Sequence, residues 1–188
     1  MLERFKVFWR YTPWLATLLL GLAGTAPAAE TALDRYVAKP DPNYAYDNYL
    51  TKREAGYTAY FLEMTSQQWR SATEVDRPLW KHDVVIVIPQ FSIDSSDTAI
   101  LLITGGDNLG SPPDTVDPVV GAAAVATGAI MVAVRQIPNQ PLFFADDPNR
   151  GRKEDAILGY SLGKALDTGD PEWAVHLAMT KAAVRTMD

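Results

Sequence analysis

The 188-residue chain contains no cysteine and only two histidines. The lack of cysteine excludes disulfide bonds and thiolate metal ligands, so the fold must depend on packing and hydrogen bonding. With His82 and His176 alone, a zinc site would need several converging carboxylates, and the sequence gives no such cluster. We therefore expect no metal ion and no other cofactor.

Basic residues are also in deficit, because 17 lysines and arginines face 23 acidic residues and the formal net charge is −6. No lysine- or arginine-rich run is present. Sequence-independent nucleic-acid binding requires a cationic face, so this class of function is excluded. The chain length and the 47% hydrophobic content are typical of one globular domain with a moderate core.

Only the amino terminus contains a long apolar stretch. It runs over residues 14–22 and follows a basic start formed by Arg4, Lys6 and Arg10. This layout is typical of a secretory signal. We therefore expect an exported protein, periplasmic or secreted, whose residues 1–28 are removed.

The predicted cleavage lies between Ala28 and Ala29, because Ala26 and Ala28 supply the small side chains that a signal peptidase requires. The alternative is that residues 13–29 stay as a membrane anchor, since this stretch nearly reaches the roughly 17–25 residues that span a bilayer. Membrane contact is expected only through this segment. The ligand, either a small molecule or a peptide, is left open.

Residues 29–56 are predicted to be an irregular entry segment, because Pro40 and Pro42 fix the backbone and remove two hydrogen-bond donors. Residues 57–188 are predicted to form the folded domain. Its strands are expected over 56–66, 84–88, 99–104 and 129–135, with a further strand or a turn over 67–72. Its helices are expected over 118–128, 153–166 and 172–188.

The order of these elements predicts an α/β fold with a mixed sheet, antiparallel at its start and parallel later, with helices on its faces. The unbroken apolar runs at 84–88 and 99–104 predict strands that are covered on both sides. The final helix runs to Asp188 without a glycine, proline or polar stop after it. The domain therefore looks incomplete.

Seven short segments form a specific pattern. They are Ala38–Pro42, Leu62–Arg70, Val75–His82, Arg135–Leu142, Glu154–Ala156, Thr168–Trp173 and Met179–Arg185. Together they resemble the PhoPQ-activated pathogenicity-related protein family of exported α/β-hydrolase-like proteins. The resemblance implies the amino-terminal part of such a fold and, through the family's name, a role in virulence or at the cell envelope. Family members are longer, and their nucleophile turn lies beyond the point that matches Asp188.

The segment from Gly159 to Gly163 matches the hydrolase pattern G-x-S-x-G, with Ser161 as the nucleophile and His176 as the one histidine that follows it. That pattern works only between a strand and a helix, where a sharp turn exposes the serine. Here it falls inside a predicted helix. We therefore prefer a helix-packing serine, and we expect the nucleophile, acid and histidine of a triad to be absent from this chain.

The better candidate for chemistry is Gly105-Gly106-Asp107, which follows a predicted strand where hydrolases of this fold place an oxyanion-hole donor. An ordinary glycine turn is the alternative.

His82 is predicted to be a surface or strand-entry histidine rather than a base. The acidic pairs 94/97, 114/117 and 146/147 are interpreted as turn residues, and Trp69, Trp80 and Trp173 as core residues rather than sugar-stacking platforms.

Three hypotheses result from these patterns. The first is a truncated, exported member of the family that is not catalytically competent by itself. The second is a serine hydrolase of esters or amides that uses Ser161. The third is a small exported binding module that uses the loop at Gly105 and Gly106 as its contact surface.

Overall fold

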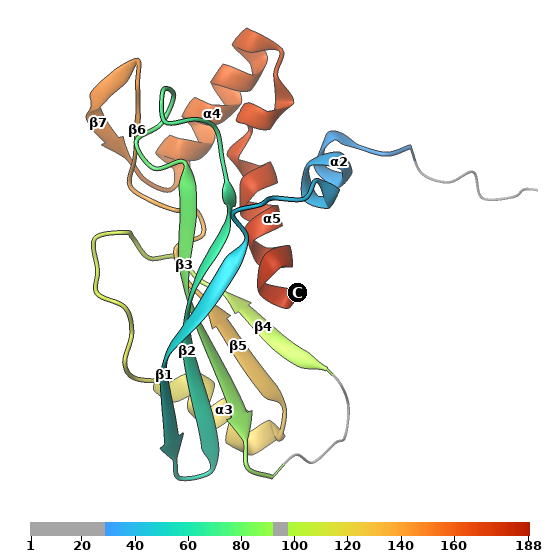
Figure 1. Ribbon diagram of the computed structural model, residues 1–188, viewed down its shortest axis with the longest axis vertical. Coiled ribbons are helices and arrows are strands. Elements are labelled where there is room, and N and C mark those ends of the chain that lie inside the picture. Colours follow the sequence, from blue (N-terminus) through green and yellow to red (C-terminus); the bar gives the residue numbers. More distant parts are fainter. Residues whose placement is uncertain (1–28, 92–97) are drawn as a thin grey trace, which may run out of the picture. The chain divides into compact units, whose positions relative to one another are not determined.

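A mixed sheet forms the centre of the computed structural model, which describes residues 29–91 and 98–188 (Figure 1). Its strands are β1 (Ala45–Glu54), β2 (Tyr57–Gln68), β3 (Leu79–Pro89), β4 (Ala99–Ile103) and β5 (Ile130–Val134). Their order in the sheet is β1-β2-β3-β5-β4. β1, β2, β3 and β5 pair antiparallel in turn, and β4 pairs parallel with β5. The predicted α/β fold with an antiparallel start and a parallel continuation is therefore confirmed.

Helices cover both faces of this sheet. The remaining elements are α2 (Ala32–Ala38), α3 (Pro118–Thr127), the hairpin β6 (Leu142–Phe144) and β7 (Asp147–Arg152), α4 (Asp155–Thr168), the 3-10 turn η2 (Pro171–Trp173) and α5 (Val175–Met187). α5 packs with α2 and β2 on one face, and α3 packs on the other face against β2, β3 and β5 (Figure 1).

The side chains of β3 are buried on both faces of the sheet. Val84 and Ile86 pack into the hydrophobic cluster of α5, whereas Val85 and Val87 pack into the cluster of α3. Successive side chains of a strand point to opposite faces, so a strand covered on both sides needs an unbroken apolar run. The prediction that 84–88 is such a strand is confirmed.

The same prediction for 99–104 is wrong. β4 forms as expected, but it lies at the edge of the sheet, and Ile100, Leu102 and Ile103 are 43%, 36% and 54% exposed. The apolar sequence of β4 is typical of a buried strand, but none of the described elements covers these three side chains. Leu101 alone packs against the cluster of α5.

The prediction of an irregular segment over 29–56 is also wrong, because this stretch contains α2 and β1. α2 begins with a capping box, in which the Thr31 hydroxyl accepts from the Asp34 backbone N–H and the Asp34 carboxylate accepts from the Thr31 N–H. β1 is an edge strand with almost every residue exposed. A strand without a buried face has no apolar alternation to reveal it.

The three predicted helices are present. α3 ends at Gly128, whose left-handed backbone (φ 67°) suits glycine and closes the helix. The last predicted helix is divided: Asp170 caps the 3-10 turn η2, and α5 starts only at Val175. The alternatives for 67–72 are also resolved, since β2 continues to Gln68 with an irregular register between Thr65 and Gln67.

The largest side chains meet where the sheet joins α4, α5 and the hairpin. Trp69, Trp80 and Trp173 are 1%, 0% and 8% exposed, which confirms their prediction as core residues. Trp69 packs edge-on against the other two indoles and against Phe144, with ring centroids 5.6–6.4 Å apart. Because the rings cover one another, their faces are not available for stacking on a sugar.

Candidate functional site

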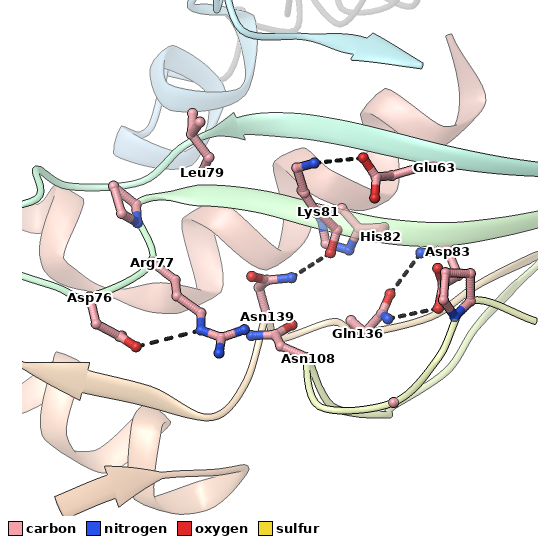
Figure 2. A pocket seen from close by; sticks show the side chains of 13 residues that line it. Glu63, Asp76, Arg77, Leu79, Lys81, His82, Asp83, Asn108, Gln136 and Asn139 are labelled. Atoms are coloured by element: carbon pink, nitrogen blue, oxygen red, sulfur yellow. Dashed lines mark hydrogen bonds and ion pairs between the residues drawn. The ribbon is translucent and has the colours of Figure 1, made fainter. Parts of the chain in front are cut away.

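A cleft of about 460 Å³ lies where β4 and β5 end and β3 begins (Figure 2). Ligands of open α/β sheets bind outside the carboxyl ends of the parallel strands, so this position is the expected one. β2 and β3 form one wall, and the loops that follow β4 and β5 form the other. The polar lining residues are Glu63, Asp76, Arg77, Lys81, His82, Asp83, Asn108, Gln136 and Asn139.

Two ion pairs stand on the walls of the cleft. The Lys81 Nζ lies 2.6 Å from Glu63 Oε1, across the pair of strands β2 and β3. The Arg77 Nε lies 3.5 Å from Asp76 Oδ2, and Asp76 Oδ1 also accepts from the Phe143 backbone N–H at 2.9 Å. The second contact ties the turn that carries Arg77 to the β6–β7 hairpin.

Asp83 and Gln136 form a reciprocal pair at the base of the cleft. The Gln136 amide donates to Asp83 Oδ2 at 2.7 Å, and its oxygen accepts from the Asp83 N–H at 2.7 Å. Burial raises the pKa of the Asp83 carboxyl, and the hydrogen bond from Gln136 opposes this rise. Gln136 has a positive φ of 59°, a conformation that is uncommon for residues other than glycine.

His82 is buried near the start of β3, with 1% exposure, so the surface alternative of its prediction is wrong and the strand-entry alternative is observed. Its Nε2 lies 2.9 Å from the Ser66 hydroxyl, and its Nδ1 lies 3.1 Å from the Arg135 carbonyl oxygen. Burial lowers the pKa of His82 to about 4, so the ring is neutral near pH 7. Ser66 is fully buried, and this serine–histidine pair therefore serves the structure rather than chemistry on a ligand.

The candidate oxyanion loop lies directly before the cleft. The Gly105 carbonyl accepts from the Gln136 N–H at 3.1 Å, and the Gly106 carbonyl accepts from the Gln140 side chain at 3.0 Å. Asp107 pairs with Lys153 at 2.9 Å, and this hydrogen bond lowers the pKa of Asp107. Gly106 has a φ of 121°, which requires glycine. The loop is thereby fixed, and the residues after it, Asn108 and Gly110, line the cleft.

The sequence did not single out Arg77, Asn108 and Asn139 as site residues. The Asn139 side-chain amide donates to the Lys81 carbonyl, and the Asn108 N–H donates to the Gln140 carbonyl at 2.6 Å. The Asn108 Nδ2 is buried and has no hydrogen-bond partner among the described residues. Arg77 and Asn139 fall within two of the family-like segments. This position was the one feature of the sequence that could have identified them as site residues.

Ser161 and His176 are not brought together as a catalytic pair. Ser161 is fully buried in the middle of α4, and its hydroxyl donates to the Leu158 carbonyl at 3.1 Å and accepts from the Val175 N–H at 3.2 Å. His176 is exposed on α5. No hydrogen bond connects the two within the described ranges. The predicted helical setting of Ser161 is observed, and its hydroxyl joins α4 to α5.

The acidic residues predicted to lie in turns have different outcomes. Asp114 lies in the loop before α3, Asp117 caps α3 by accepting from the Val119 N–H at 2.8 Å, and Asp146 lies in the turn between β6 and β7. The prediction is wrong for Asp147, which is the first residue of β7 and pairs with Arg152 at 2.8 Å. Asp94 and Asp97 lie outside the described residues, as do Ala28 and the rest of the predicted signal.

Within residues 29–91 and 98–188, no three acidic or histidine side chains group as a metal site would require. In the same ranges no helix has the length and apolar character needed to cross a bilayer.

Comparison with known proteins gives a relative by sequence and a match among solved structures. The autocrine proliferation repressor protein A of Dictyostelium discoideum is 36% identical over 172 residues, which cover 91% of this chain and 34% of that protein. This chain thus spans about a third of the length of that relative. The crystal structure of a protein from Bacteroides fragilis, provisionally assigned as an acetyl xylan esterase, matches with a TM-score of 0.47 at 17% identity, over 83% of this chain and 40% of that one.

The family comparison covers most of the chain. The model of the PhoPQ-activated pathogenicity-related protein family matches residues 33–188, which include every strand and helix described above except the first residue of α2. The match confirms the family that the seven segments resemble. This chain belongs to the PhoPQ-activated pathogenicity-related protein family.

Proposed function

We propose that this chain is an exported protein with an α/β-hydrolase-like architecture, whose cleft binds a small polar ligand without forming a covalent bond to it. One observation carries the proposal: the cleft lies at the carboxyl ends of β4 and β5, and most of its lining is charged or amide side chains. The signal-like sequence of residues 1–28 supports export, and so does the word autocrine in the name of the Dictyostelium relative.

The chemistry of the lining favours binding over covalent catalysis. None of the described residues that line the cleft is serine, threonine or cysteine. The Ser161 hydroxyl donates one hydrogen bond and accepts another, both with backbone groups of the helical layer. A nucleophile needs an adjacent base and access to the substrate, and Ser161 has neither within the described residues.

The oxyanion-type loop is the feature that supports the hydrolase-like architecture. Gly105 and Gly106 connect β4 to the region before α3, and a strand-to-helix loop at this place supplies an oxyanion donor in hydrolases of this fold. The family description also motivates a role in pathogenicity. A deletion strain that infects as well as its parent would argue against that role.

The binding proposal is tested by filling the cleft. Gly110 lines the cleft, and a side chain added there meets no atom within 4 Å, so Gly110→Trp places an indole in the cleft without a clash at Cβ. A library of polar compounds is screened against the full chain by ligand-observed NMR. We expect binders whose affinity falls at least about tenfold in Gly110→Trp, since a 1.4 kcal/mol loss already has this effect.

The matched control is Gly159→Trp on α4, where an added side chain is equally free of neighbours but lies outside the cleft lining. This variant should bind like the parent chain. The proposal fails if no compound class binds, or if the binders tolerate tryptophan at both positions equally.

A further inference from the structure

The carboxylates of the cleft all have partners, whereas one buried amide donor has none. Each of its three carboxylates has a partner within the chain: Glu63 pairs with Lys81, Asp76 with Arg77, and Asp83 with Gln136. Asp76 accepts a second hydrogen bond, from the Phe143 N–H. The three carboxylates are therefore already neutralised or hydrogen-bonded within the chain.

The donor side differs. The Asn108 Nδ2 is buried without a partner among the described residues, although buried polar atoms are almost always hydrogen-bonded. Arg77 reaches Asp76 through Nε, and Figure 2 shows its guanidinium extending toward Asn108 and Asn139, which line the same cleft. An unpaired buried amide costs about 1–3 kcal/mol, so a group that accepts its hydrogen bond would stabilise the complex.

We infer that the ligand of this cleft carries a carboxylate, and that Arg77 and Asn108 hold it. This inference rests on the proposed binding function and names the class of its ligand. A guanidinium presents parallel N–H groups that match the two oxygens of a carboxylate, and the Asn108 amide adds a third donor to one of them.

The surrounding charges favour a single negative charge over two. Three carboxylates, Glu63, Asp76 and Asp83, line the cleft against the two cations Arg77 and Lys81, so a phosphate dianion would be repelled more strongly than a carboxylate monoanion. The Arg77 side chain is 40% exposed, so its attraction to the ligand is only partly screened by water. A small organic acid is therefore the ligand class that fits this corner.

The experiment uses three acids and their neutral counterparts with the full chain: N-acetylglycine and N-acetylglycinamide, glucuronate and glucose, lactate and 1,2-propanediol. Affinities are measured by saturation-transfer NMR. At least one acid should bind at least tenfold more tightly than its neutral counterpart. Arg77→Met and Asn108→Ala should each reduce this preference to threefold or less, and Arg77→Lys should retain part of it because it keeps the charge but loses the fork.

Arg53→Met on β1 and Asn149→Ala on β7 are the matched controls, since both residues are exposed and lie outside the cleft lining. They should keep the full preference. Circular dichroism checks that each variant is folded, and Arg77→Lys replaces Arg77→Met if the latter is not.

The inference is overturned if no acid binds, or if acid and neutral compound bind equally well. A neutral compound could bind the parent chain and Arg77→Met equally and still be blocked by Gly110→Trp. This result would support the proposed binding function and refute the inference that the ligand carries a carboxylate. Loss of all binding in the wider library would instead remove the binding function itself.

Discussion

His82 couples the stability of the fold to pH. Its pKa is lowered to about 4 by burial, whereas a histidine of the unfolded chain titrates near 6.5. Between these values the unfolded chain binds the additional proton, so the free energy of unfolding falls as the pH decreases from about 6.5 toward 4. From pH 7.5 to 5.0 this single group should cost about 2 kcal/mol.

The measurement is urea unfolding of the parent chain and His82→Gln at both pH values. Because glutamine does not titrate, His82→Gln should lose about 2 kcal/mol less than the parent between pH 7.5 and 5.0. His176→Gln is the matched control, since His176 is exposed, and it should follow the parent. Equal pH dependence of parent and His82→Gln would contradict the prediction.

Single residues also show which parts of the site the sequence could predict. Gly105 and Gly106 were singled out because glycines after an apolar strand are a local signal, and the structure places them just before the cleft-lining residues Asn108 and Gly110. Asn108 became a candidate only through its surroundings: its amide is one of many in the sequence, and what sets it apart is a buried nitrogen without a partner. Ser161 shows the reverse, since its motif was prominent and the helix predicted around it is present.

At the scale of elements, α2 is attached to the rest of the fold by the buried ring of Tyr36 and by a few polar contacts. The Tyr36 hydroxyl donates to Gln67 Oε1 at 2.8 Å, and the Gln67 amide donates to the Ala178 carbonyl of α5 at 2.7 Å. The Lys181 Nζ donates to the Lys39 carbonyl at 2.6 Å, at the end of α2. Favourable interaction of a cation with a helix carboxyl terminus adds to this contact.

Tyr36→Phe should therefore weaken the attachment of α2. The change leaves the buried oxygen of Gln67 without its donor, which costs about 1–3 kcal/mol of unfolding free energy in urea. Tyr46→Phe on β1 makes the same change at a side chain that is 65% exposed, and it should stay within about 0.5 kcal/mol of the parent. An equal effect of both changes would show that the Tyr36–Gln67 contact contributes nothing specific.

The elements that the sequence predicted are those with a buried face. β3, β5 and α3 contact neighbours that impose a pattern on their sequences. β5 and α3 were predicted to within one residue, whereas β3 was predicted only over its second half. β1 lies at one edge with polar residues on both faces, and it was missed. β4 has the sequence of a central strand but lies at the other edge, so its existence was predicted and its burial was not. Whether such a strand is buried depends on its neighbours in the sheet, which the sequence alone does not identify.

At the scale of the whole molecule, export would change both length and charge. Residues 1–28 contain Arg4, Lys6 and Arg10 against Glu3, so their removal makes an acidic chain more acidic. We predict that the exported product, expressed in a bacterial host, begins at Ala29 by intact-mass measurement. Ala28→Arg should block the cut because the peptidase requires a small residue there, whereas Ala29→Ser should be processed normally. Recovery of the uncut parent chain from the periplasm would contradict the prediction.

The tryptophan cluster makes this protein an optical reporter of its own assembly. Of the five tryptophans, Trp9 and Trp14 lie in the segment expected to be removed, and the other three share one cluster. Indoles held edge-on at 5.6 and 6.3 Å have a fixed chiral arrangement, which gives a near-ultraviolet circular dichroism signal that is lost when the rings rotate freely. Because Trp69 directly follows β2, Trp80 lies in β3 and Trp173 lies in η2, that signal records the docking of the helical layer onto the sheet without any label.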